Sequence, residues 1–178
     1  MTAYCLQCQT QQSSAVAELL EAMGTGRAFT PRILQRQRKQ GETKEIYRDL
    51  LPGYVFLFRE EPLESFYRYL AMNGVIRFLQ YEDKSRELRG ADYDFAARLY
   101  QREGKVGVVT ALKEGDTVRM ADPLFAAHDG RILRLDIRKG RAKVAFTFDE
   151  QEIEVWVACD VMRSQEDRLS EVFFRFDY

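Results

Sequence analysis

The run Tyr54-Val55-Phe56-Leu57-Phe58, introduced by Pro52-Gly53, constrains the fold more than any other stretch of the chain. A short, continuous apolar run after a turn signal is typical of a strand that is buried on both faces of a sheet. Such a strand needs neighbouring strands and covering helices. The surrounding sequence should therefore supply both.

Two helices are predicted around this strand, because apolar residues recur three and four positions apart. In the first helix, which Gly24 ends, the apolar stripe consists of Val16, Leu19, Leu20 and Met23. In the second helix, which begins at Pro62, it consists of Leu63, Phe66, Tyr67 and Leu70.

Further strands are predicted over Tyr4–Cys8 and Val75–Tyr81, together with a basic hairpin that turns at Gly41. The order strand, helix, hairpin, strand, helix, strand indicates an α+β sandwich, in which both helices pack on a mainly antiparallel sheet. We assign this domain to residues 1–81.

The pattern changes beyond residue 81. Residues 82–103 are predicted to be a linker, charged at first and ending in a short helix in which Phe95 and Leu99 face inward. Short alternating segments follow, which are typical of half-buried strands: Thr117–Met120, Arg131–Ile137, Ala142–Phe148 and Glu152–Val157. These strands predict a small β-barrel over residues 104–163. A tail, 164–178, ends in the aromatic segment Val172–Tyr178, which could pack, pair as an edge strand, self-associate or stay disordered.

Composition excludes several classes of protein. No apolar run approaches the roughly 20 residues that span a bilayer, and the first residues do not resemble a signal peptide, so we expect a cytoplasmic protein without membrane contact. The three cysteines fit reduced thiols better than a disulfide framework. The spacing Cys5-Leu6-Gln7-Cys8 lacks the further ligands that zinc needs, so no metal or cofactor is expected. No nucleophile elbow or phosphate-binding loop is present, and we expect no enzyme.

The net charge of −1 hides two basic segments. Residues 27–48 hold seven basic and two acidic residues, and residues 131–143 hold six basic and one acidic residue. Such segments neutralise phosphates in some proteins and are solvated faces balanced by distant acids in others. Composition leaves both readings open.

Several motifs, in this order and spacing, resemble the NusG family of transcription elongation factors. They are Leu51-Pro52-Gly53-Tyr54-Val55-Phe56, Asn73-Gly74-Val75-Ile76-Arg77-Phe78-Leu79, Lys113-Glu114-Gly115-Asp116-Thr117-Val118-Arg119 and Asp129-Gly130-Arg131-Ile132. The resemblance covers about residues 3–163. It implies that residues 1–81 form the NusG N-terminal (NGN) domain and that residues 104–163 form a KOW barrel. From the sequence alone, we expect Gly130 to hold a backbone conformation that a side chain would strain.

The resemblance also implies that the NGN domain binds the clamp helices of the RNA polymerase largest subunit in an apolar groove. The positions that match the family pattern are Tyr4, Leu51, Tyr54, Phe56 and Phe78. Aromatic residues of strand 54–58 line this groove or belong to the core, and the pattern does not decide between these alternatives.

Within the family, the segment Ala121–Gly130 and the stretch Arg141-Ala142-Lys143 resemble LoaP, the specialised paralog of long biosynthetic operons. This implies antitermination through a nascent RNA hairpin bound by the KOW domain. A predicted hairpin turn presents cations that suit recognition of RNA by shape and phosphate. The candidate RNA-binding residues are Arg131, Arg138, Lys139, Arg141 and Lys143.

Other partners stay open at this stage. Non-template DNA is a further candidate ligand. A general housekeeping factor would use its KOW domain to bind Rho or a ribosomal protein. A ribosome-associated KOW protein is a third class, which the NGN-like segment disfavours.

Overall fold

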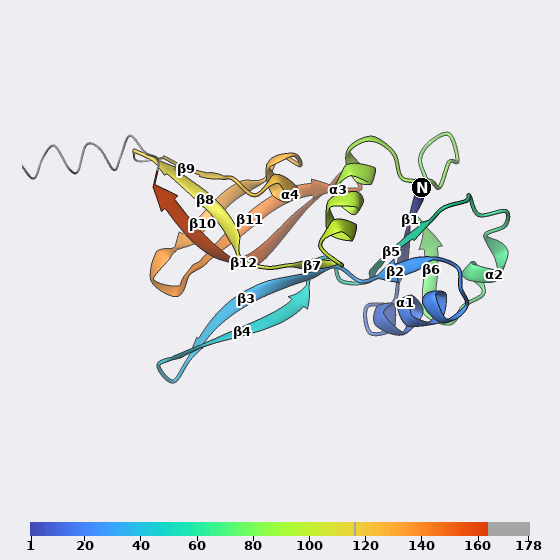
Figure 1. Ribbon diagram of the computed structural model, residues 1–178, viewed down its shortest axis with the longest axis horizontal. Coiled ribbons are helices and arrows are strands. Elements are labelled where there is room, and N and C mark those ends of the chain that lie inside the picture. The colour runs from blue at the N-terminus through green and yellow to red at the C-terminus, as the bar shows by residue number, and fades with distance from the viewer. Residues whose placement is uncertain (116, 164–178) are drawn as a thin grey trace, which may run out of the picture. The chain divides into compact units, whose positions relative to one another are not determined.

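The computed structural model describes residues 1–115 and 117–163 (Figure 1). The chain divides into two compact units. Unit 1 contains Met1–Ile33 and Arg48–Val106, and unit 2 contains Leu34–Tyr47 and the chain from Gly107 onward. The predicted tail, 164–178, and Asp116 of the KOW-like motif lie outside the described residues.

The sheet of unit 1 has the order β2-β5-β1-β6. Its strands are β1 (Thr2–Cys8), β2 (Arg27–Phe29), β5 (Tyr54–Arg59) and β6 (Val75–Phe78), and each neighbouring pair is antiparallel. All four inner residues of β5 are buried. The strand predicted to be buried on both faces is therefore confirmed.

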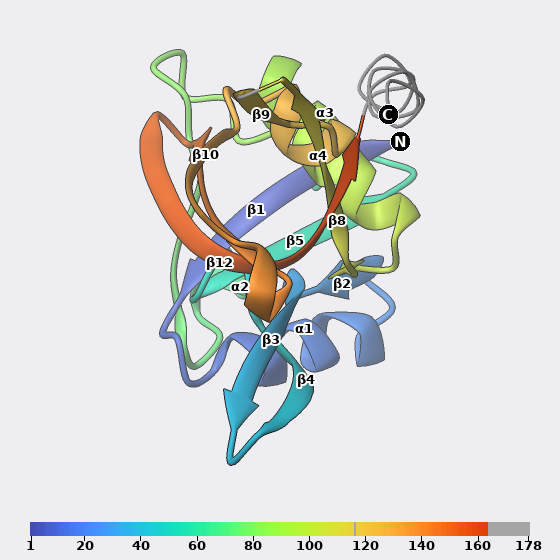
Figure 2. The same ribbon diagram turned by 90° about the vertical axis from the view of Figure 1, so that its left-hand side faces the viewer.

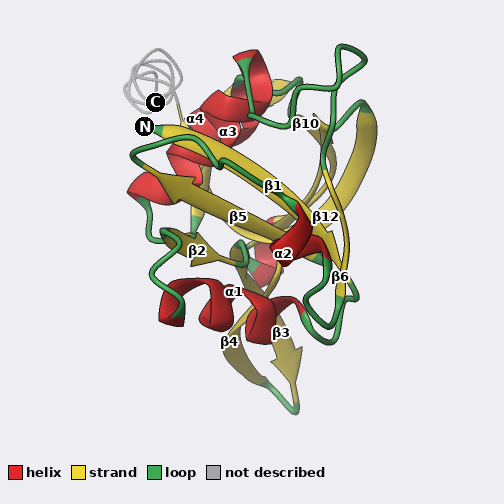
Figure 3. Ribbon diagram, turned by 90° about the vertical axis from the view of Figure 1, so that its right-hand side faces the viewer, coloured by secondary structure: helices red, strands yellow, loops and turns green. Residues whose placement is uncertain are grey.

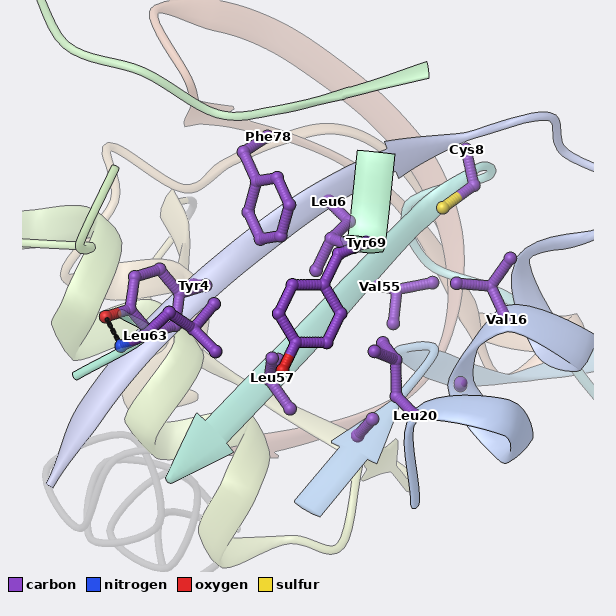
Figure 4. Close-up of a cluster of buried hydrophobic side chains, with 12 residues drawn as sticks. Tyr4, Leu6, Cys8, Val16, Leu20, Val55, Leu57, Leu63, Tyr69 and Phe78 are labelled. Carbon is purple, nitrogen blue, oxygen red and sulfur yellow. Dashed lines mark hydrogen bonds between the residues drawn. The ribbon is translucent and has the colours of Figure 1, made fainter. Parts of the chain in front are cut away.

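Helix α1 (Ser13–Ala22) covers one face of this sheet. Figure 4 shows Val16 and Leu20 of the helix beside Val55 and Leu57 of β5. The predicted stripe is confirmed for Val16 and Leu20 and wrong for Leu19 and Met23, which are 48% and 43% exposed. The buried stripe uses the smaller Ser13 and Ala17 in their place, and it has the same helical spacing: Ser13, Val16, Ala17 and Leu20.

Helix α2 (Tyr67–Leu70) lies on the same face and is a single turn (Figure 3). The helix predicted from Pro62 is wrong over its first half. The backbone N–H of Leu63, outside the helix, donates to the hydroxyl of Tyr4 at 3.0 Å. In the helix Tyr69 is buried, whereas Tyr67 is 85% exposed.

Helix α3 (Gly90–Gln101) covers the opposite face of the sheet. The ring centroids of Phe95 and Phe56 lie 6.5 Å apart, and those of Tyr100 and Phe58 lie 4.6 Å apart. The prediction that Phe95 and Leu99 face inward is confirmed, since both are fully buried. The helix begins earlier than predicted.

Residues 82–103, predicted to be a linker with a short helix, fall within unit 1. The backbone N–H of Leu88 donates to the carbonyl of Ala3 at 2.8 Å, and Tyr4 forms an isolated bridge with Glu87. The high charge of this segment hid these backbone contacts. The predicted limits of independently folding domains stay a prediction.

The basic hairpin consists of β3 (Arg32–Lys39) and β4 (Glu42–Asp49), with Gly41 at a φ of +86° in the turn. A short strand, β7 (Lys105–Val106), pairs in parallel with the start of β3. The predicted hairpin is confirmed. Its outer part, Leu34–Tyr47, belongs to unit 2.

The remainder of unit 2 is a curled sheet of order β10-β11-β12-β8-β9 (Figure 2). Its strands are β8 (Val109–Glu114), β9 (Thr117–Met120), β10 (Arg131–Asp136), β11 (Arg141–Phe148) and β12 (Gln151–Arg163). The two edge strands, β9 and β10, contact each other. The predicted α+β sandwich followed by a small β-barrel is therefore confirmed.

Three details of the barrel were not predicted. Strand β12 continues far beyond Val157, because its second half pairs in parallel with β8. A short helix, α4 (Pro123–Ala126), is capped by the Asp122 side chain, which accepts the N–H of Leu124 at 2.9 Å. The predicted turn between β10 and β11 contains a 3-10 helix, η1 (Ile137–Lys139), and only this conformation was not predicted.

Gly130 is required for a reason other than the one predicted. Its φ angle does not lie in the left-handed region. A Cβ atom at this position would instead lie 2.4 Å from the carbonyl oxygen of Phe125, which already accepts the Gly130 N–H at 2.8 Å. Close packing against α4 therefore excludes a side chain here.

Candidate functional site

The five residues predicted to bind the polymerase do not line one groove. Tyr4 and Phe78 lie on the α1 side of the sheet, with ring centroids 6.3 Å apart. Phe56 lies on the α3 side against Phe95. Together with Leu51, these residues are at most 3% exposed. The structure thus places four of the five in the core of unit 1, and their role in binding stays a prediction.

Tyr4 is held by its hydroxyl group as well as by its ring. The hydroxyl accepts the N–H of Leu63 and donates to Oε1 of Glu87 at 3.1 Å. Burial, followed by the contact with the Glu87 carboxylate, raises the pKa of Tyr4 above its ordinary value. The residue thereby ties β1 to two segments that are distant in the sequence.

Tyr54 differs from the other four because it is only half-buried. It is the cross-strand neighbour of Gln7, which in turn neighbours Arg77 on β6. Nε of Arg77 donates to Oε1 of Gln7 at 2.7 Å. Gln7 lies two residues beyond Cys5, the partner of Phe56, so this row lies on the α3 side of the sheet. Solvent reaches this end of the predicted binding surface.

A second partly apolar surface lies around α2 and was missed. A pocket of about 200 Å³ is lined by residues that flank this helix: Glu64, Ser65, Phe66, Tyr67, Leu70 and Arg86. The guanidinium carbon of Arg86 lies 4.6 Å from the ring centroid of Phe66. The predicted stripe had placed Tyr67 in the core, so the sequence pattern pointed away from this surface.

The predicted hairpin turn of the basic cluster is confirmed. Arg138 and Lys139 lie on η1, and Gly140 follows at a φ of +58° before β11 begins. The turn is fixed by Asp136, whose side chain accepts the N–H of Lys139 at 3.2 Å. Arg138 and Lys139 are exposed.

Carboxylates balance most of this cluster. The ion pairs of its cations are Arg131–Glu152, Lys139–Asp136 at 3.7 Å, Arg141–Asp136 at 3.5 Å and Lys143–Glu154. Among the described residues Arg138 has no ion-pair partner. Partly exposed pairs of this kind stabilise by only about 0–1 kcal/mol, so a phosphate can compete for the cations. Because Glu152 and Glu154 of β12 lie beside the cluster, the local excess of positive charge is smaller than the count over residues 131–143 indicates.

Two residues beside the cluster were missed. Trp156 is the cross-strand neighbour of Lys143, and the guanidinium carbon of Arg141 lies 4.4 Å from its ring centroid. Arg36 of β3 contacts Gly140 of the turn. The two-residue turn Asp149-Glu150 fixes the register of β11 and β12, so counting back from it would have placed Trp156 beside Lys143.

Within residues 1–115 and 117–163, no group of three or more potential ligands could hold a metal ion. Cys8 belongs to the core cluster on the α1 side, whereas Cys5 points to the other face of β1. The two thiols therefore cannot bind the same metal ion. Burial raises the pKa of Cys8 and of Cys159 to about 11. Among the described residues no helix is long and apolar enough to cross a membrane.

The comparisons with known proteins agree with this architecture. A family model described as "Transcription termination factor nusG" matches residues 2–94. A solved structure described as "Domain interaction in Thermotoga maritima NusG" is similar, with a TM-score of 0.54 and 18% sequence identity. That match covers 88% of this chain and 92% of the other, and at this identity it bears on the fold alone. No match was found among the curated proteins.

Proposed function

The chain belongs to the NusG family of non-enzymatic transcription factors, and we propose that it is an elongation and antitermination factor that binds RNA polymerase through unit 1 and a structured nascent RNA through unit 2. Factors of this family bind RNA polymerase. The observation that carries the proposal is the family match over residues 2–94, which includes every strand of the unit 1 sheet.

For the polymerase, we propose contact through the row Tyr54, Gln7 and Arg77. Its members are partly exposed, and the row combines an aromatic ring, an amide and a guanidinium. A helix pair such as the clamp helices of the largest subunit offers both apolar and polar side chains to a surface of this composition. The buried residues Tyr4, Leu51, Phe56 and Phe78 would then act by shaping the sheet.

For RNA, we propose binding at the η1 turn and the adjoining strands. The candidate residues are those of the basic cluster: Arg131, Arg138, Lys139, Arg141 and Lys143. The turn is well defined by the Asp136 side chain, and its two central cations are exposed. Binding of this kind would allow LoaP-like antitermination, in which the leader hairpin selects the operon.

A second candidate function is that of a general factor whose barrel binds Rho or a ribosomal protein. Two observations favour it. The cations are balanced by carboxylates, and the apolar side chains of Leu133 and Ile137 are 46% and 67% exposed beside them. Exposed apolar residues with a polar surround are typical of protein interfaces.

Transcription with purified polymerase separates the two functions. The template carries the leader of the protein's own operon upstream of an intrinsic terminator. We expect the protein to raise readthrough on this template and not on a matched template with an unstructured leader of equal length. An equal effect on both templates would contradict the RNA-dependent function. If Rho or ribosomal protein then bound unit 2 in a direct titration, the second candidate would replace it.

A further inference from the structure

Unit 2 contains a small pocket beside the basic cluster. Its volume is about 110 Å³, and it is lined by residues of β3 and of the β11–β12 pair: Gln35, Arg36, Gln37, Arg141, Trp156 and Val157. Small-molecule sites usually measure roughly 300–1,000 Å³. This pocket therefore suits one planar group of a larger ligand better than a whole free ligand.

Arg36 fixes the wall of the pocket that β3 supplies. Its Nε donates to Oε1 of Glu45 at 2.9 Å, and its Nη1 donates to Oδ1 of Asp160 at 2.7 Å and to the carbonyl of Gly140 at 3.4 Å. The Arg36 side chain is only 19% exposed. A Cβ atom at Gly140 would lie 2.7 Å from Nη1, so the glycine leaves room for this contact.

Arg141 and Trp156 form the opposite wall as a stacked pair. The Nε atom of Arg141 is buried, and it lies 3.5 Å from Oδ2 of Asp136 as an ion pair. The ring of Trp156 is half-buried, and it is the one tryptophan of the whole sequence. The pair therefore offers flat surfaces to an occupant of the pocket.

The charges around the pocket argue against a free anion as its occupant. Arg36 is balanced by Glu45 and Asp160, and Arg141 lies beside Asp136. The side-chain amides of Gln35 and Gln37 line the pocket and can both donate and accept hydrogen bonds. A neutral, planar, hydrogen-bonding group meets all of these conditions.

We propose that this pocket takes one unpaired nucleobase of the RNA that the basic cluster binds through phosphates. This inference rests on the proposed function and narrows the RNA to one with a bulged or looped-out nucleotide. Unpaired bases stack on aromatic rings and on guanidinium planes, and glutamine and arginine side chains read base edges. The pocket would supply base recognition that the phosphate contacts lack.

The single tryptophan makes occupancy of the pocket directly measurable. The probes are synthetic RNA hairpins with one bulged nucleotide, the same hairpins with an abasic bulge, and fully paired hairpins of equal length. We expect a bulged base to quench Trp156 fluorescence and to strengthen binding about tenfold over the abasic bulge. If all three RNAs bound with equal affinity and gave equal Trp156 emission, the pocket would not bind a nucleobase. The proposed RNA-binding function would still stand. If none of the RNAs bound at low salt, the proposed function itself would fail.

Two variants complete the test. Trp156→Leu should remove the preference for the bulged base, and circular dichroism checks that the variant is folded. Arg138→Ala lies outside the pocket and should weaken binding of the bulged and abasic hairpins by the same factor. A loss of preference in Arg138→Ala alone would contradict the assignment. A DNA hairpin with the same bulged base serves as a further control. If it quenched Trp156 fluorescence and bound as tightly as the RNA, the assignment of RNA as the ligand would be overturned.

Discussion

Unit 1 and unit 2 each stack an arginine on a half-buried aromatic ring, and the two stacks differ in what surrounds them. In unit 1 the guanidinium carbon of Arg89 lies 4.3 Å from the ring centroid of Tyr81. The Tyr81 hydroxyl donates to Oδ2 of Asp92 at 2.9 Å, and Arg89 pairs with Asp83 at 2.6 Å. The Tyr81 hydroxyl, which also accepts the backbone N–H of Arg89 at 3.2 Å, is thus bonded within unit 1.

In unit 2 the corresponding pair, Arg141 and Trp156, borders an open pocket, and the buried Nε of Arg141 has only an ion pair with Asp136 at 3.5 Å among the described residues. Buried polar groups are normally satisfied. The comparison teaches that an arginine stacked on an aromatic ring is a structural tie where the ring hydroxyl is bonded within its own unit, and a candidate binding surface where the stack borders a pocket.

The remaining rings of unit 1 sharpen the contrast, since most of them fill the core on the two faces of the sheet. Replacing Phe95 by Ala should lower the free energy of unfolding by about 3–5 kcal/mol, because the ring is fully buried against Phe56. Urea unfolding followed by circular dichroism measures this loss. The control Tyr67→Ala, at an 85% exposed ring, should change stability by at most about 0.5 kcal/mol. Equal effects would show that α3 does not cover the sheet.

Tyr54 is the exception among the predicted polymerase contacts, because it is half-buried. Tyr54→Ala should weaken binding to purified polymerase by about 1–3 kcal/mol and leave the chain folded. A fluorescence titration with labelled protein measures the affinity. If Tyr67→Ala weakened binding and Tyr54→Ala did not, the contact would belong to the surface around α2.

The sequence predicted where strands and helices lie more accurately than it predicted which side of each element is buried. The run 54–58 and the strand Thr117–Met120 were located correctly, because short apolar or alternating runs between turn signals have few other uses. The stripe of α1 was misplaced, because two overlapping stripes both have helical spacing and the true one contains Ser13 and Ala17. Helix α2 was predicted to begin too early, because the apolar spacing of Leu63 and Phe66 fits a helix although the backbone is helical only over Tyr67–Leu70.

The candidate site shows the same limit. The turn of the basic cluster follows from local sequence, and it was predicted. Its balancing acids Glu152 and Glu154 lie on the next strand, and Asp160, which holds Arg36, lies beyond them. A count of charges within one segment cannot include such partners. The core position of Phe56 likewise depends on α3, whose Phe95 packs against it. This helix was predicted as part of a linker because the residues before it are highly charged.

The function proposed for the surface of unit 2 can be tested by its response to salt. Lys139→Ala combined with Arg141→Ala should lower RNA affinity and reduce the slope of log affinity against log salt by up to about two. A gel-shift series at several salt concentrations gives both quantities. Since Arg141 also stacks on Trp156, the slope reports the phosphate contacts more directly than the affinity does.

The matched control for that series is Arg119→Ala. Arg119 is an exposed arginine of unit 2 that pairs with Glu114 and lies on β9, outside the cluster. The Arg119→Ala variant should leave the slope of log affinity against log salt unchanged within error. If both variants reduced the slope equally, RNA would be attracted by the general charge of the barrel and not by the η1 turn.

The smallest expected effect concerns the stack of Arg89 on Tyr81 in unit 1. Burial, followed by the contact with Asp92, raises the pKa of Tyr81 to about 12. In the unfolded chain a tyrosine ionises near pH 10. The stability that comes from keeping Tyr81 neutral is therefore complete below about pH 10 and is lost as the pH rises from about 10 toward about 12.

Tyr81→Phe removes this ionisation together with the hydroxyl contacts. At neutral pH the variant should be less stable by about 0.5–1.5 kcal/mol, the usual net contribution of one hydrogen bond. Its free energy of unfolding should then fall less steeply than that of the wild type above about pH 10. Tyr4, whose pKa is also raised, keeps some dependence on pH in both proteins, so the comparison rests on the difference between their slopes. Parallel curves would mean that the Tyr81 hydroxyl is open to solvent, and they would contradict its enclosure by Asp92 and Arg89 in unit 1.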